Sequence, residues 1–167
     1  MKATKAFFLF LAFVVPIGIF VFLKLFGRNE FDVAPLYVSE APPRLEGCTE
    51  AGKPYHVPDS IRTAYMLPGD SLTVIFFQPL SGEALNQLDR VREQTINDPV
   101  RLTAGDSTSS AEGVDALRIR RCAFFMEGQV NVVMLDRRGL IRGQYKAADR
   151  EEMDRLLTEI TILLRKY

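Results

Sequence analysis

The most pronounced hydrophobic pattern lies near the N-terminus, where residues 6–23 form 18 consecutive uncharged positions, AFFLFLAFVVPIGIFVFL. Lys24 interrupts the apolar run, and Leu25 and Phe26 extend it. A helix that crosses a bilayer needs about 20 apolar residues, because its backbone N–H and C=O groups must be satisfied inside the hydrocarbon layer. The pattern therefore predicts one N-terminal transmembrane helix, which we place in residues 1–28.

A cleavable secretory signal is the alternative for this segment, because Lys2 and Lys5 give it a basic start. The following sequence, KLFGRNEFDVAP, contains no small-residue cleavage site, and no cysteine that could accept a lipid occurs before Cys48. An uncleaved anchor is therefore favoured. Positive charges flank both ends of the run, so the positive-inside rule does not decide its orientation.

The next segment is rich in proline. Five prolines interrupt it, at Pro35, Pro42, Pro43, Pro54 and Pro58. Proline blocks regular helix and sheet pairing, and an extended, semi-rigid stretch of this kind is typical of a spacer. We therefore predict a proline-rich linker over residues 29–58 and a folded domain over residues 59–167.

The domain begins with a strand pattern that is followed by a helix pattern. Residues 71–78, SLTVIFFQ, form a β-branched and aromatic run between turn residues, as in a strand buried on both faces. Ser81 is a suitable N-cap for a helix over about residues 82–95, whose apolar positions recur at helical spacing. A second strand is predicted at residues 99–104 and a polar loop at residues 105–113.

The C-terminal third predicts a hairpin and a closing helix. VNVVMLD and LIRGQY flank a short turn that carries Gly139, where a positive φ is needed. Asp149 and Glu152 have the spacing of a capping box before a helix with one apolar stripe. With residues 114–128 unassigned, the order strand, helix, strand, hairpin, helix predicts an α/β protein. We expect a thioredoxin-like fold, a central mixed sheet flanked by helices.

Length and charge narrow the function classes. The chain has 167 residues, enough for one ordinary domain beside the N-terminal segment. After Arg28 it carries 17 basic and 21 acidic side chains, a balance that argues against a dedicated nucleic-acid binder. One histidine, His56, and two cysteines, Cys48 and Cys122, leave few side chains for metal or thiol chemistry.

The C-terminal segment VVMLDRRGLIRGQYKAADREEMDRLLTEITILL resembles the signature of the Sco/SenC proteins, which are membrane-anchored and thioredoxin-like. The anchor, followed by FGRNEFDVAPLY and then by PYHVPD, is similar to membrane-proximal segments of bacterial relatives. The resemblance implies a single-pass protein of the inner membrane with a periplasmic domain, contacting the lipid bilayer through its N-terminal helix. It also implies a protein partner in a membrane complex and a place in respiratory cytochrome oxidase biogenesis.

Family members with known chemistry carry a C-x-x-x-C pair after the first long strand and a distant histidine, which bind copper or exchange disulfides. The five positions of that pair fall here on Gln78, Pro79, Leu80, Ser81 and Gly82. No histidine follows His56. Glutamine and glycine neither replace two thiolate ligands of Cu(I) nor form a disulfide. The comparison therefore implies a non-catalytic binding or assembly module that uses no cofactor.

Three hypotheses remain open for the cysteines, one of which is that both are free and unpaired. The favoured one is a structural disulfide between Cys48 and Cys122, which suits an oxidising compartment and stabilises by about 3 to 5 kcal/mol in the chain-entropy model. The third is that the two thiolates, with His56, hold copper or zinc, or exchange disulfides, in a copper chaperone or thiol oxidoreductase. A separate hypothesis for the whole chain is a purely structural subunit of a membrane complex, unrelated to thioredoxin.

Three further groups of side chains have simpler interpretations. Two clusters of arginines could form a basic face toward an acidic partner or lipid head groups, but we favour an ordinary solvated surface. The clusters are Arg118, Arg120 and Arg121, and Arg137, Arg138 and Arg142. Acidic residues in the first turn of the closing helix complement its dipole; they are Glu151, Glu152 and Asp154. Four aromatic residues are predicted to lie in the core: Phe76, Phe77, Phe124 and Phe125.

Overall fold

The chain divides into two units in the computed structural model, which describes residues 2–26, 32–105 and 116–166. The first unit, Met1–Asp32, contains helix α1 (Lys2–Phe26), and Pro16 lies inside that helix. Within the part of the chain that the structure describes, none of the helices has the length and apolarity of a membrane-crossing segment.

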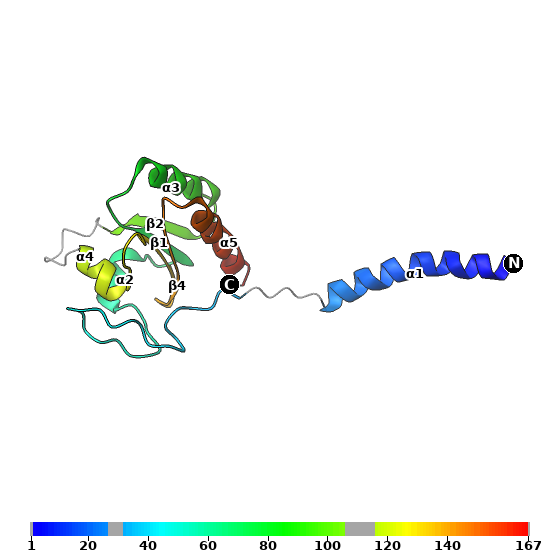
Figure 1. The fold of residues 1–167 in the computed structure, drawn as a ribbon, viewed down its shortest axis with the longest axis horizontal. Helices are drawn as coiled ribbons and strands as arrows, with labels where there is room; N and C mark the ends of the chain where they lie inside the picture. The colour runs from blue at the N-terminus through cyan, green and yellow to red at the C-terminus, as the bar shows by residue number, and fades with distance from the viewer. Residues whose placement is uncertain (1, 27–31, 106–115, 167) are drawn as a thin grey trace. The chain divides into compact units, whose positions relative to one another are not determined.

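The second unit, Val33–Tyr167, is built on a four-stranded mixed sheet with strand order β2-β1-β3-β4 (Figure 1). The strands are β1 (Leu72–Phe76), β2 (Val100–Ala104), β3 (Val132–Asp136) and β4 (Ile141–Tyr145). Strands β1 and β2 are parallel and are joined through helix α3 (Gly82–Gln94), whereas β1 with β3 and β3 with β4 are antiparallel. The predicted α/β class and mixed sheet are confirmed.

Helices cover both faces of this sheet (Figure 1). Helices α3 and α5 (Arg150–Lys166) pack on one face, and α2 (Asp59–Tyr65), α4 (Ala116–Arg118) and the π-helical turn η2 (Ile119–Ala123) belong to the other side. Successive strand residues alternate between the two faces. In β1, Leu72 and Val74 join the α3 and α5 side of the core, and Ile75 joins the other.

The predicted elements of the sheet are present, with slightly shorter bounds. Ser81 caps α3 by accepting a hydrogen bond from the Ala84 amide at 3.2 Å, and Gly139 of the hairpin turn has a φ of 77°. The unassigned stretch 114–128 contains α4 and η2. Apart from Gly105, the expected polar loop at 105–113 lies outside the described residues.

The capping box of α5 forms only one of its two arms. Asp149 Oδ1 accepts from the amides of Glu151 at 3.0 Å and Glu152 at 3.4 Å, as predicted. The Glu152 carboxylate, however, pairs with Arg155 at 2.7 Å, while the Asp149 amide donates to the Lys146 carbonyl at 3.0 Å. An ion pair three residues along the helix thus replaces the reciprocal hydrogen bond.

The acidic first turn and the apolar stripe of α5 both connect the helix to the domain. Asp154 pairs with Arg90 of α3 at 2.7 Å, which ties the two helices together. Four stripe residues are almost completely buried, and two more pack against them: Met153, Leu156, Ile160 and Leu163, with Leu157 and Leu164. The predicted stripe therefore faces the core.

The segment predicted as a linker differs from that prediction, because residues 33–58 belong to the second unit and lie against the sheet. The Leu36 amide donates to the Ile141 carbonyl on β4 at 2.7 Å, and the Val57 amide donates to the Gly139 carbonyl at 3.0 Å. Extended, proline-interrupted backbone can still pair along the edge of a sheet. The segment covers the β4 edge and is part of the folded unit.

Aromatic packing holds the same segment in place. Phe125 makes edge contacts with Tyr37 and Tyr55, with ring centroids 5.3 and 4.8 Å apart. The Tyr55 hydroxyl donates to the Ala123 carbonyl at 2.8 Å, and burial raises the pKa of Tyr55 to about 12. Phe125 has a φ of 54°, a left-handed conformation that is costly for a residue with a side chain. The two tyrosine rings help to hold it there.

The four predicted core phenylalanines divide into two groups. Phe77, Phe124 and Phe125 are buried, as predicted. Phe76 is half-buried and packs against the side of the core that α3 and α5 cover.

Arg142 differs from the surface role expected of its cluster, because it is buried in an ion pair with Asp136. Its Nε and Nη2 donate to Asp136 Oδ2 at 2.9 and 2.8 Å, and its Nη1 donates to the Val33 carbonyl at 2.8 Å. Asp136 Oδ1 also accepts from the amides of Arg138 and Leu140. This pair therefore closes the hairpin turn and secures the start of the second unit.

Candidate functional site

The predicted disulfide between Cys48 and Cys122 is present, with the Cα atoms 5.2 Å apart. It connects the segment that covers β4 with η2. Because both sulfur atoms are bonded to each other, neither is a thiolate available to a metal ion in this state. His56, the third member of the alternative metal set, is exposed. The described residues contain no group of three or more metal-ligating side chains.

The disulfide lines a cavity of about 780 Å³. Both cysteines are half-buried there, and the surrounding wall includes the apolar side chains of Tyr55, Ile61 and Ile119. This cavity is one of two that bear on the sequence predictions.

The second cavity lies at the positions where the resemblance to Sco/SenC proteins puts a cysteine pair. Those five positions are Gln78, Pro79, Leu80, Ser81 and Gly82. The peptide bond between Gln78 and Pro79 is cis, and Gln78 Oε1 accepts a hydrogen bond from the Leu80 amide at 3.1 Å. Ser81 caps α3, of which Gly82 is the first residue. The five positions thus form a fixed turn and a helix start.

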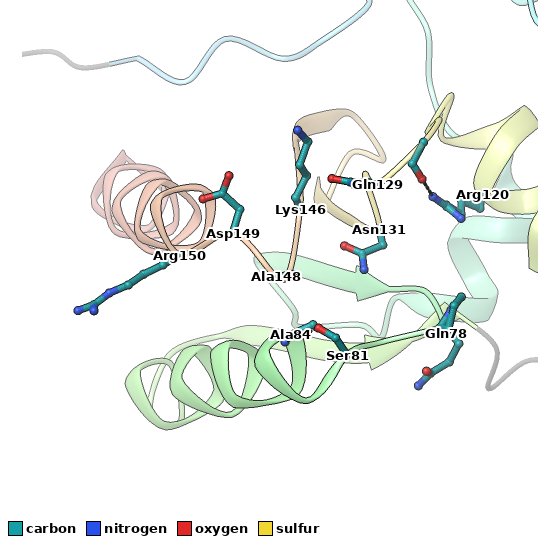
Figure 2. A pocket seen from close by; sticks show the side chains of 12 residues that line it. Gln78, Ser81, Ala84, Arg120, Gln129, Asn131, Lys146, Ala148, Asp149 and Arg150 are labelled. Atoms are coloured by element: carbon teal, nitrogen blue, oxygen red, sulfur yellow. Dashed lines mark hydrogen bonds between the residues drawn. The ribbon is translucent and has the colours of Figure 1, made fainter.

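A polar cavity of about 660 Å³ opens beside this turn, at the carboxyl end of β1 (Figure 2). Its walls come from the turn after β1, the first turn of α3, residues 128–131 before β3, and residues 146–150 between β4 and α5. Arg120 of η2 adds to the wall. In α/β sheets, the carboxyl ends of strands at a change of chain direction are the usual location of a ligand.

The hydrogen-bond acceptors of the cavity are largely used within the protein. Asn131 Oδ1 accepts from the Ala147 amide at 2.8 Å, which identifies the contacting atom as the oxygen and leaves the amide nitrogen as a donor. Figure 2 shows that nitrogen directed toward the α3 side of the cavity. Gln78 Oε1 is occupied by Leu80 in the same way. Both amide nitrogens therefore remain as hydrogen-bond donors, and that of Asn131 faces the cavity.

Arg120 has a structural and an electrostatic role at the cavity. Its Nε and Nη2 donate to the Val130 carbonyl at 3.2 and 2.7 Å, and its Nη2 donates to the Gly128 carbonyl at 2.6 Å. These bonds hold the turn that forms one wall. Since carbonyl oxygens do not neutralise a guanidinium, the positive charge remains at the site.

The cavity carries a net positive charge. Arg120, Lys146 and Arg150 line it together with one carboxylate, Asp149, which caps α5. Within the described parts of the chain, no ion pair joins any of these three cations to a carboxylate. The site therefore suits a ligand that accepts hydrogen bonds and carries negative charge.

Sequence reasoning found part of this site and missed the rest. Positions 78–82 were singled out as a degenerate cysteine-pair site, and Arg120 was noted in an arginine cluster that was expected to be ordinary solvated surface. Asn131, Lys146 and Arg150 were missed, because nothing in their local sequence distinguishes them from surface residues.

Comparison with known proteins finds no matching protein-family model and no curated protein with significant sequence similarity.

Proposed function

We propose that this chain is a membrane-anchored, non-catalytic binding or assembly module with a thioredoxin-like domain of the Sco/SenC type. The observation that carries the proposal is the donor-rich, cationic cavity, which occupies the place where the family pattern puts its cysteine pair. Respiratory cytochrome oxidase biogenesis is the process that the resemblance suggests. The partner is a protein of a membrane complex.

The chain organisation supports this proposal. A parallel β1-α3-β2 unit followed by an antiparallel hairpin and a helix has the element order expected of a thioredoxin-like domain. The uncharged residues 6–23 supply the anchor. The Cys48–Cys122 disulfide suits a domain on the periplasmic side of the membrane, since disulfides persist in oxidising compartments.

The chemistry of the cavity supports binding rather than bond making. The described residues that line it include neither a thiol nor an imidazole. One oxygen of Asp149 accepts from the amides at the start of α5, and the other polar side chains are amides, a hydroxyl and cations. Such groups orient and hold a ligand, whereas nucleophilic catalysis requires an activated nucleophile beside a base.

Site-specific photo-crosslinking tests the proposal. A photoreactive residue at Gln129, on the cavity wall, is expected to crosslink one protein in membranes of the native cells. The matched control is the same residue at Ile96, which is 75% exposed just after the opposite end of α3. An absence of adducts at Gln129, or the same adducts at both positions, contradicts the proposal.

A thiol-disulfide or copper-handling protein is a second candidate, favoured by the position of the Cys48–Cys122 disulfide in an apolar cavity. A partner thiolate would attack one sulfur to form a mixed disulfide, and the partner's second thiol would resolve it. The partner is then oxidised to a disulfide, and Cys48 and Cys122 are reduced to two thiols that copper could bind. A redox titration decides: a potential below about −300 mV indicates a structural bond, and a higher one indicates exchange.

A further inference from the structure

We propose that the cavity at the carboxyl end of β1 binds an acidic peptide segment of the partner protein. This inference rests on the proposed binding function and names the chemistry of the partner. Three features of the cavity wall select such a ligand: its hydrogen-bond polarity, its charge and the directions of its cationic side chains.

The hydrogen-bond polarity selects a ligand rich in acceptors. The side-chain oxygens of Asn131 and Gln78 are engaged with backbone amides, at 2.8 and 3.1 Å, so their nitrogens remain as donors. Ser81 Oγ likewise accepts from Ala84 and keeps its own O–H. The second oxygen of Asp149 and the Gln129 amide oxygen are the acceptors that remain on the side chains of the wall. A ligand must therefore mainly accept hydrogen bonds.

The charge selects an anion. Three cations against one carboxylate leave an excess of two positive charges around a partly enclosed polar space. Charge-assisted hydrogen bonds from Lys and Arg to carboxylates are roughly twice as strong as neutral ones. A neutral ligand would leave these interactions unused.

The directions of the cations favour an extended ligand over a single phosphate group. In Figure 2 the side chains of Lys146 and Arg150 point away from each other, from opposite sides of Asp149. In these directions a single phosphate contacts one of the two side chains unless the other changes its rotamer, whereas carboxylates spaced along a peptide can contact both. A peptide also brings neutral carbonyl oxygens, which match the neutral amide donors of Asn131 and Gln78.

Peptide binding to the full chain in a neutral detergent tests the inference. The probe is a fluorescent peptide of alternating glutamate and glycine, followed by anisotropy, and the matched probe has glutamine in place of glutamate. We expect saturable binding of the glutamate peptide that weakens with added salt, since exposed charge pairs are screened over about 10 Å at 0.1 M salt. The glutamine peptide is expected to bind far more weakly.

Two pairs of substitutions locate the binding. Lys146→Gln with Arg150→Gln removes two exposed cavity cations, and the expected affinity is at least about five-fold lower. Arg121→Gln with Arg165→Gln makes the same change in net charge at exposed positions outside the cavity wall, and should alter affinity by less than about two-fold. An equal loss in both pairs overturns the inference, because it shows that total charge alone attracts the peptide.

A near-isosteric substitution tests the orientation of the Asn131 amide. Asn131→Asp keeps the oxygen that accepts from Ala147 and turns the donor facing the cavity into an anionic oxygen. Binding of the glutamate peptide is expected to be lost, while circular dichroism checks that the domain is folded. If this variant does not fold, the exposed pair Lys146→Gln and Arg150→Gln still decides the question.

The remaining outcomes separate this inference from the proposed function. If inorganic phosphate or phosphatidylglycerol vesicles bind at the cavity and the glutamate peptide does not, the ligand is a phosphate and the inference is wrong. If Gln129 crosslinks a partner but no glutamate peptide binds, the binding module stands and its acidic ligand does not. If the peptide binds and no partner crosslinks, the acidic-peptide site stands and the assembly function does not.

Discussion

Removing the Cys48–Cys122 disulfide measures how strongly it stabilises the domain. The perturbation is the double substitution Cys48→Ser and Cys122→Ser, which leaves the contacts of Leu36 and Val57 with the sheet in place. The native structure therefore keeps its main attachments. The substitutions are expected to act on the unfolded chain, whose conformational entropy rises when the loop between the two cysteines is no longer closed.

The magnitude follows from the sequence separation of 74 residues between the two cysteines. In the chain-entropy model, closing a loop of this length lowers the entropy of the unfolded chain by about 15 cal/mol/K, or about 4.5 kcal/mol at 25 °C. Domains are commonly stable by only about 5–15 kcal/mol. The double variant should therefore be folded but markedly weakened.

Urea unfolding followed by near-ultraviolet circular dichroism measures this loss. All five tyrosines lie after residue 32, so the signal reports on the second unit. With a denaturant slope near 2 to 3 kcal/mol per molar urea, the midpoint should fall by roughly 2 M. The control is the unsubstituted chain treated with reductant, which should unfold at the same concentration as the double variant.

A loss smaller than about 1 kcal/mol would refute this reasoning, because the closed loop would then impose almost no entropy cost on the unfolded chain. Reduction without any effect on the midpoint would contradict the reasoning in the same way.

Two further predictions concern buried polar groups. Asp136→Ala leaves the Arg142 guanidinium buried without its carboxylate, so we expect the free energy of unfolding in urea to fall by about 3–5 kcal/mol. A double variant that also carries Arg142→Met should lose less than the sum of the two single losses. Additive losses would contradict the pairing. The pKa of Tyr55 is raised to about 12 by burial, against about 10 in an unfolded chain, so its contribution is complete below pH 10 and is lost as the pH rises toward 12. The midpoint of unfolding should therefore fall less steeply over this range in Tyr55→Phe than in the unsubstituted chain, and parallel pH profiles would argue against the shift.

Predictions from the sequence succeeded where a short segment decides its own structure. The apolar run of β1, the cap at Ser81 and the positive φ of Gly139 depend on neighbouring residues, so the local pattern was sufficient. The stripe of α5 was equally clear, because its apolar residues recur once per turn. The predicted hydrogen bond from the Asp149 amide to Glu152 does not form, because Arg155 pairs with the Glu152 carboxylate.

The tertiary structure alone decided which distant residues meet. Residues 33–58 look like a spacer from their prolines, yet their hydrogen bonds go to β4 and the hairpin turn. Arg142 looks like a surface arginine, yet Asp136 and Val33 enclose it.

The same division holds for the candidate site. The sequence by itself singled out positions 78–82 only as the place where the resemblance puts a cysteine pair, and it favoured a disulfide between Cys48 and Cys122 over open alternatives. It could not place Asn131 and Lys146 beside those positions, because periodicity records which face of an element is apolar and not which elements share an edge. Packing of the sheet and helices brought those donors together, and with them the charge of the cavity.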